Sequence, residues 1–256
     1  MTQKIRPFIV LSHQRSGTTK LCNEILSNHE CVFSFDELFN QPNHNPTQKA
    51  LDKIGLESFY SFRAKIEGRI FGSEKRFLRY HQRFLKTINK NTNKESIGFK
   101  LFTNQVPPTI LERFLCNSNI KIILLQRRNL TKAAVSIYLL LNHGQRNSRD
   151  KTNLQPYEID IDWCANWIAK NRLDIKRAKN QLKKCNKEYL YVEYEELFEL
   201  SKINQIFEFL GVSPIEKLPS TGLKKMSSED TYRKMINLQE FQEKICNDYN
   251  GYLFEK

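Results

Sequence analysis

Ser12-His13-Gln14-Arg15-Ser16-Gly17-Thr18-Thr19-Lys20-Leu21 is the stretch that decides the fold of this chain. The residues before it, Ile5 to Leu11, are mostly apolar, and their β-branched and aromatic side chains predict a buried strand. After it, apolar side chains recur at helical spacing, at Leu21, Cys22, Ile25 and Leu26. The stretch is therefore the loop between a strand and the start of a helix.

The composition of this loop is typical of an anion-binding site. Gly17 lets the backbone approach a ligand without a Cβ in the way. The first N–H groups of the helix are unsatisfied and lie at the positive end of its dipole. The hydroxyls of Thr18 and Thr19 and the guanidinium of Arg15 add to them, which predicts a phosphate site. The alternative is an ordinary N-capped helix after a strand.

The loop does not match the Walker A pattern, which needs Gly, four residues and then Gly-Lys-Ser/Thr. Ser12 stands where the first glycine should be, and Lys20 follows two threonines. A nucleotide kinase or NTPase, the second function considered, would therefore lack its phosphate-binding lysine. The chain also has no clear apolar strand that ends in Asp and would supply a magnesium ligand.

Length, hydrophobic content and charge limit the class of protein. With 256 residues, 39% of them hydrophobic, the chain is long enough for a full core, and we expect one domain over residues 1–256. A loop rich in Pro and Asn, followed by aromatic and basic residues at helical spacing, predicts a helical insertion or lid at about residues 40–95. The net charge of +13 favours anionic partners. The lysines are spread along the chain, so their positions do not indicate which kind of anionic partner binds.

The six cysteines form no CxxC pair, which argues against a zinc ribbon. Cys22 and Cys116 stand in apolar periodic segments and are expected to be buried as small hydrophobic side chains. This pattern favours a reducing compartment. The sequence shows no signal peptide and no stretch long enough to span a membrane, and we predict a cytoplasmic protein.

Further apolar runs predict the rest of a sheet, at Cys31–Phe35, Ser96–Phe102, Ile120–Gln126 and Glu188–Val192. The run Ile120–Gln126 is almost continuously apolar, as in a central parallel strand that is covered on both faces. We therefore predict an α/β fold with a central parallel sheet flanked by helices on both faces. In this sheet we expect Cys31–Phe35 to lie next to the first strand.

A second strand-loop-helix unit begins with Ile120–Gln126. Arg127-Arg128-Asn129 follows the strand, and a helix from Leu130 to about Leu141 carries Ser136. Because ligands of open α/β sheets bind at the carboxyl ends of the strands, we expect this unit to lie beside the first loop. The alternative is that Arg128 caps the sheet and Ser136 bonds within its own helix.

The two units together resemble the donor-binding loops of sulfotransferases that use 3′-phosphoadenosine 5′-phosphosulfate (PAPS). In that family a basic residue precedes Ser-Gly-Thr-Thr in the 5′-phosphosulfate loop, and Arg15 stands at this position. The 3′-phosphate is gripped by the Arg of an Arg-Asn-Pro motif and by a Ser eight positions later, the spacing of Arg128 and Ser136 here. Leu130 replaces the Pro, a departure that affects the turn and not the ligands.

The resemblance extends from about residue 7 to residue 245 and includes three later landmarks: Tyr194–Leu197, Ile206–Gly211 and the basic segment Leu223–Met226. It implies a P-loop-like sulfotransferase fold. It also implies transfer of a sulfuryl group from PAPS to an acceptor hydroxyl or amine, such as one on a carbohydrate or glycolipid, with release of 3′-phosphoadenosine 5′-phosphate (PAP). No metal is expected, because sulfuryl oxygens carry less charge than phosphoryl oxygens. The residues implied for the donor are Arg15, Ser16, Gly17, Thr18, Thr19, Arg128, Ser136, Lys224 and Lys225.

A sulfuryl transfer also needs a general base that takes the proton of the acceptor. The family uses His or Glu, and Glu37 is our first candidate, ahead of Asp36, His13 and His29. Arg15 would neutralise charge on the leaving phosphate, and Lys100 is a candidate for steadying the sulfuryl group. The alternatives are that Asp36 or Glu37 caps a helix and that Lys100 extends from a strand end towards solvent.

A third function considered is a non-enzymatic module that binds nucleic acid or a sulfated polymer. The net charge supports it, and so does a mixed aromatic and basic stripe at Phe77, Arg79, Tyr80, Arg83 and Phe84. Such a stripe is more often a helix with one buried face. The paired nucleotide loops argue against this function, and we do not expect nucleic acid to be a partner.

Overall fold

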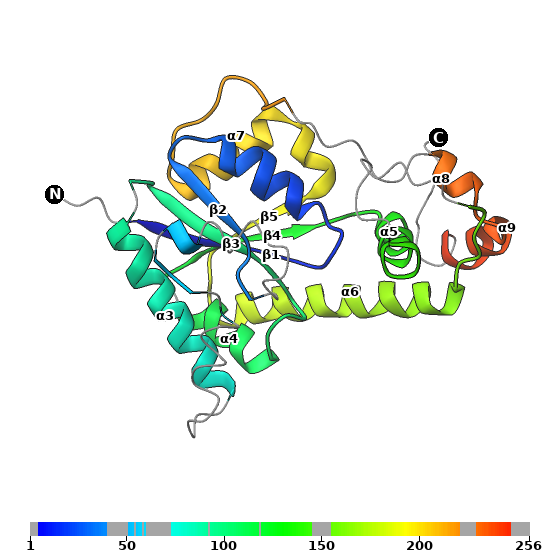
Figure 1. Cartoon of the computed structure of the whole chain (residues 1–256), viewed down its shortest axis with the longest axis horizontal. Coiled ribbons are helices and arrows are strands. Elements are labelled where there is room, and N and C mark those ends of the chain that lie inside the picture. Colours follow the sequence, from blue (N-terminus) through cyan, green and yellow to red (C-terminus); the bar gives the residue numbers. More distant parts are fainter. Residues whose placement is uncertain are drawn as a thin grey trace.

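The structure, a computed structural model, describes residues 5–39, 51–53, 55–57, 59, 73–91, 93–117, 119–144, 155–220 and 229–246 (Figure 1). It contains a five-stranded sheet of order β2-β3-β1-β4-β5, in which every pairing is parallel. The strands are β1(Arg6–Ser12), β2(Val32–Glu37), β3(Ser96–Phe102), β4(Lys121–Gln126) and β5(Tyr189–Glu193). The predicted parallel α/β fold is confirmed.

One prediction about the sheet is wrong, because β2 does not lie next to β1. β3 lies between them and pairs with β1 along its whole length, from Ser96 opposite Arg6 to Phe102 opposite Ser12. Every residue of β3 is buried, whereas Phe33, Asp36 and Glu37 of β2 are partly exposed. β2 thus occupies the edge of the sheet, where a strand does not need a continuous apolar run.

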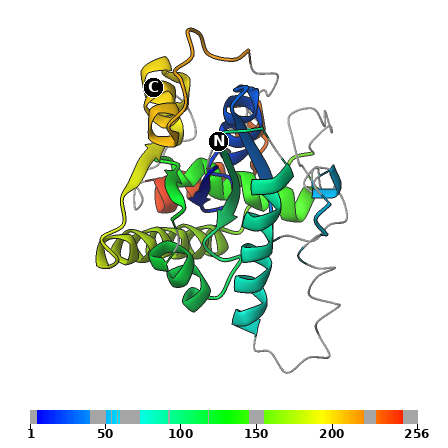
Figure 2. The ribbon, with the colours of Figure 1, turned by 90° about the vertical axis from the view of Figure 1, so that its left-hand side faces the viewer.

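Helices cover both faces of the sheet (Figures 1 and 2). Side chains of a strand point to alternate faces, so Ile9 and Leu11 pack into one core and Phe8 and Val10 into another. The first core lies against α3(Ser73–Asn91), α4(Pro108–Asn117) and the second half of α6(Ile161–Lys184). The second core lies against η1(Lys20–Ile25) and α7(Leu200–Leu210), and Gly211 ends α7 with φ 78°, as expected for a left-handed helix end.

A third apolar cluster extends beyond the carboxyl edge of the sheet. It joins α5(Leu130–His143) and the first half of α6 to the last helices of the chain, seen at the right of Figure 1. The described residues also form the helices η2(Leu26–Asn28), η3(Tyr194–Phe198), α8(Glu229–Arg233), α9(Leu238–Phe241) and η4(Gln242–Cys246). Of the predicted insertion at 40–95, the structure describes α3, residues 93–95 and a few residues between 51 and 59, and the rest lies outside the described residues.

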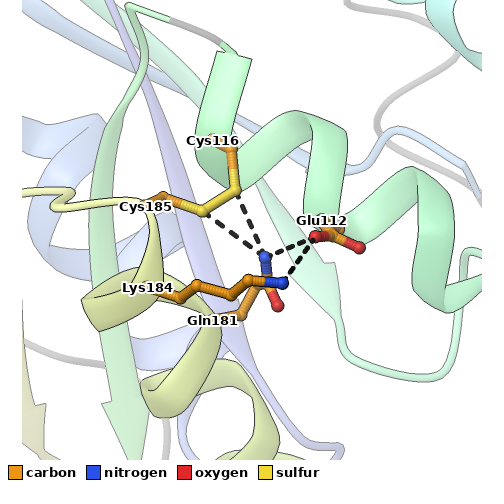
Figure 3. The surroundings of a disulfide bond; sticks show 5 residues. All are labelled: Glu112, Cys116, Gln181, Lys184 and Cys185. Carbon is orange, nitrogen blue, oxygen red and sulfur yellow. Dashed lines mark hydrogen bonds and ion pairs between the residues drawn. A yellow bond between two sulfur atoms is a disulfide. The ribbon is translucent and has the colours of Figure 1, made fainter.

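A disulfide joins Cys116 near the end of α4 to Cys185 directly after α6, with Cα atoms 5.1 Å apart (Figure 3). The amide of Gln181 and the carboxylate of Glu112 lie beside it. The prediction of Cys116 as a buried thiol is wrong, whereas Cys22 is fully buried as expected. With this disulfide, the cysteine pattern no longer favours a reducing compartment, and the cytoplasmic location stays a prediction.

His81 of α3 predicts a loss of stability at acidic pH. It is buried, its ring centroid lies 4.8 Å from that of Phe114, and burial lowers its pKa from 6.5 to about 4. The unfolded chain therefore binds a proton here at a higher pH than the folded chain. This difference costs the folded state about 2 kcal/mol between about pH 7 and about pH 5. We expect the free energy of unfolding, measured in urea titrations, to fall less over this pH range in His81→Phe than in the unmodified protein. An unchanged pH dependence in the variant would contradict this role of His81.

Candidate active site

The residues predicted for the site gather at the carboxyl edge of the sheet. The loop at residues 13–19 follows β1, and Arg127 and Arg128 follow β4. Glu37 ends β2, and Lys100 stands near the end of β3. This edge is where open α/β sheets bind ligands, so strand topology alone brings these groups to one side of the molecule.

The loop after β1 reverses direction through two left-handed residues, Arg15 with φ 63° and Gly17 with φ 91°. Ser16 is fully buried, and its hydroxyl donates to the carbonyl of His13 at 2.7 Å. The Ser16 side chain thus closes the turn. Only the backbone N–H of Ser16 remains for the predicted contact with PAPS. Thr18 is buried and Thr19 exposed, and both are helical, so the helix starts inside the predicted Ser-Gly-Thr-Thr segment.

Two residues from other strand ends brace this loop. A Cβ at Gly17 would lie 2.0 Å from Cδ2 of Tyr194, so only glycine permits this contact. Arg127 donates to the carbonyl of Arg15 at 3.3 Å and places its guanidinium 5.1 Å from the centre of the Tyr194 ring. A left-handed conformation is costly for a residue with a side chain, and the contact with Arg127 helps to hold Arg15 in it. Sequence patterns did not assign this role to Arg127.

Arg15 points to the second strand-loop-helix unit. Its Nε donates to the hydroxyl of Ser136 on α5 at 2.9 Å. Burial, together with the nearby charge of Arg127, lowers the pKa of the Arg15 guanidinium. An anion bound here would offset the cost of placing two positive charges close together. The structure therefore brings Arg15 and Ser136 together, although they come from different predicted subsites.

Arg128 has its partners at the end of β5 and in η3. Its guanidinium bonds to the carboxylate of Glu193, and the pair is largely exposed on the Arg128 side. Glu195 accepts from the backbone N–H groups of Arg128 at 3.1 Å and Asn129 at 3.5 Å. Because Nε and Nη2 of Arg128 both donate to Glu193, a phosphate that takes this face of the guanidinium would compete with Glu193.

A buried charge cluster lies where β2 and β3 end. Lys100 is 5% exposed, and its ammonium bonds to Asp36 and lies 3.3 Å from Oε1 of Glu37. Burial acts to lower the pKa of Lys100, but the charges of Asp36 and Glu37 outweigh it and raise the pKa above its ordinary value. Lys100 is thus an ion-paired cation and does not extend to solvent as in the alternative interpretation.

The two histidines considered as bases have other surroundings. His13 is buried in edge-to-face contact with Trp167, and burial lowers its pKa from 6.5 to about 4. It therefore stays neutral near neutral pH. Both ring nitrogens of His29 lie within hydrogen-bond distance of the backbone, Nε2 near the carbonyl of Ser213 at 2.9 Å and Nδ1 near the N–H of Cys31 at 3.1 Å. These contacts give His29 a structural role.

Two other predicted groups are the lysine pair at 224–225 and the aromatic and basic stripe. Lys224 and Lys225 fall outside the described residues. In the aromatic and basic stripe of α3, Tyr80 and Phe84 are buried in the core against the sheet. The stripe is therefore a helix with one buried face, as the more common interpretation predicts, and offers no stacking surface at these two rings.

The fold and the two adjoining strand-loop-helix units define an α/β protein of the P-loop-like class. A family model described as "Sulfotransferase domain" matches residues 6–253, and the chain belongs to this family. The solved sulfotransferase domain from the curacin biosynthetic pathway is similar over 88% of this chain and 80% of that one, with 21% sequence identity and a TM-score of 0.52. The resemblance extends to the fold.

A second solved structure, a sulfotransferase from Alicyclobacillus acidocaldarius, aligns over 96% of this chain and 97% of that one, with 15% identity and a TM-score of 0.48. A search of curated protein sequences gives no match. In the described part of the chain, no helix is sufficiently long and apolar to cross a bilayer. Within the same residues, no three His, Cys, Asp or Glu side chains are grouped to hold a metal ion.

Proposed function

We propose that this sulfotransferase transfers a sulfuryl group from PAPS to a hydroxyl or amine of its acceptor, without a metal ion. The observation that carries the proposal is the position of Arg15. It lies in a left-handed turn at a helix start, and its side chain reaches Ser136 on the helix that follows β4. Helix N–H groups and a guanidinium in this arrangement favour an anion. The acceptor that the family resemblance of the sequence implies, a carbohydrate or glycolipid, is part of the proposal.

The residues fit a nucleotide with two separated phosphates, because guanidinium groups follow two neighbouring strands, β1 and β4. In the proposal, the loop from Arg15 to Thr19 holds the 5′-phosphosulfate. Arg128 and Ser136 hold the 3′-phosphate once Arg128 leaves Glu193. Lys224 and Lys225 are further residues proposed to bind the donor.

PAPS supplies the sulfuryl group. Glu37 is proposed to accept the proton of the acceptor while the acceptor atom bonds to sulfur and the bond from sulfur to the 5′-phosphate oxygen breaks. The bonding electron pair leaves with PAP, and Arg15 and the helix N–H groups stabilise the negative charge that grows on its phosphate. The ammonium of Lys100 lies 3.3 Å from Oε1 of Glu37 and holds this carboxylate in an ion pair.

Thermal-shift measurements separate this function from the two others considered. We expect PAP to raise the melting temperature without magnesium, and ATP with magnesium or an oligonucleotide to have little effect. A ligand that binds only the folded state stabilises it in proportion to the logarithm of its concentration over Kd. Stabilisation by ATP alone, or by the oligonucleotide alone, would instead support a kinase-like protein or a binding module.

Arg128→Ala is expected to weaken PAP binding by about 10- to 100-fold, because a charge-assisted contact to phosphate contributes about 1.5–3 kcal/mol. Calorimetry with PAP measures this loss, and the melting temperature of the variant without ligand checks that it is folded. The matched variant Glu193→Gln removes the present partner of Arg128 and should keep or raise PAP affinity. Unchanged affinity in folded Arg128→Ala would move the 3′-phosphate assignment to Arg127.

A further inference from the structure

The paired strands β2 and β3 contain an irregularity beside the proposed base. Their register runs regularly up to Phe35 opposite Phe99, and the next pair is Glu37 opposite Lys100, so Asp36 is an extra residue. In a regular strand, Asp36 and Glu37 would point to opposite faces. The bulge allows both carboxylates to reach the ammonium of Lys100.

A glutamine from the turn after β3 completes this cluster. The side-chain amide of Gln105 donates to Oε2 of Glu37 at 2.7 Å. The side-chain oxygen Oε1 of Gln105 accepts from the backbone N–H of Phe102 at 2.9 Å. The backbone N–H of Gln105 donates to the carbonyl of Phe102 at 3.0 Å. Because Oε1 of Gln105 is required as the acceptor for a backbone N–H, its NH₂ group must face Glu37. The backbone thus fixes the direction in which Gln105 donates.

We propose that Gln105 is a positioning residue that orients the carboxylate of Glu37 for proton transfer, an inference that rests on the proposed role of Glu37. Lys100 attracts Glu37 through one oxygen, and Gln105 holds the other. Without the amide, the carboxylate is free to turn both oxygens towards the ammonium and away from the acceptor. Misplacement of a reacting group by about 1 Å costs up to about 100-fold in rate.

Gln105→Glu separates this role from a purely structural one. The variant keeps an oxygen that accepts from the Phe102 N–H, but it replaces the donor to Glu37 with a second carboxylate. We expect turnover to fall by about 10- to 100-fold while the Kd for PAP stays within about threefold, since Gln105 acts on proton transfer. The like charge also favours the protonated form of Glu37, so the acid limb of the pH–rate profile should move to higher pH. Gln105→Met, which loses both bonds, should show the fall in turnover and a lower melting temperature.

The probe is ³⁵S-labelled PAPS with water as acceptor, and turnover is the release of labelled sulfate. Glu37→Gln is measured in parallel. Suppose that Glu37→Gln is impaired. The inference is then overturned if Gln105→Glu turns over within twofold of the unmodified protein and the acid limb of its pH–rate profile is not shifted. Unimpaired Glu37→Gln instead overturns the base assignment, and the inference falls with it. An NMR titration of the protein with ¹³C-labelled glutamate gives a readout that does not depend on turnover. The midpoint for Glu37 should rise in Gln105→Glu. An unchanged midpoint counts against the proposed contact.

Discussion

Glu37→Gln should lower turnover by about 10²- to 10⁴-fold, the contribution expected of a general base. The substitution keeps the size of the side chain and one acceptor oxygen, so the hydrogen bond from Gln105 can be retained. In the proposal PAP does not contact this carboxylate, so we expect its affinity to stay nearly unchanged. Labelled PAPS, with water or an identified acceptor, gives the turnover, and calorimetry gives the affinity.

Asp36→Asn is the matched control, because it removes the same charge from the same lysine. We expect a much smaller loss of turnover for Asp36→Asn than for Glu37→Gln. The reverse order would assign the base to Asp36. If both variants keep turnover within a few-fold of the unmodified enzyme, the carboxylates are structural and serve only to neutralise Lys100.

Arg15→Ala should lower turnover by about 10²- to 10³-fold, as is typical when a group that stabilises developing charge is removed. Arg15 is the basic residue of the loop, and its Nε donates to the hydroxyl of Ser136 on α5. PAP affinity should fall as well, since the same group contacts the 5′-phosphate in the proposal. Both quantities are measurable with the assays used for Glu37.

Ser136→Ala tests whether the effect comes from the charge of Arg15 or from its neighbour. It removes the acceptor of the Arg15 Nε–H and leaves the guanidinium in place. We expect Ser136→Ala to weaken PAP binding with a smaller effect on the chemical step. Turnover of Arg15→Ala within tenfold of the unmodified enzyme, in a variant that remains folded, would remove Arg15 from the mechanism.

Periodicity and loop chemistry predicted most of the fold. Ser96–Phe102 is a strand with the predicted bounds, and the strand-loop-helix unit around Gly17 forms as expected. These segments are local: a strand is recognised from its own apolar run, and the loop from its glycine and hydroxyl residues. The family assignment, which rested on the two strand-loop-helix units, is confirmed by the match over residues 6–253.

Features that depend on distant partners were not predicted. The position of β2 at the edge of the sheet follows from its pairing with β3, and a run of six residues carries no information about its neighbour. Glu193 competes for Arg128 from 65 residues away, and Cys185 pairs with Cys116 across 69. Six cysteines allow many pairings, so their spacing cannot select one.

The candidate site shows the same division. Arg15, Lys100 and Glu37 were predicted, because unusual side chains at strand ends are visible in the sequence. Gln105 and the bulge at Asp36 were not, since a bulge adds one residue to one strand and changes no composition. The second interaction of Glu37 could be recognised only after β2 and β3 were paired.

The central claim is that this protein recognises a nucleotide by two separate phosphates, and calorimetry with PAP and AMP in the absence of magnesium tests it most directly. The two ligands differ only in the 3′-phosphate. A charge-assisted contact to that group should make PAP bind about 10- to 100-fold more tightly than AMP. Equal affinity for PAP and AMP would contradict the account, because it would leave Arg128 and Ser136 without a phosphate to bind.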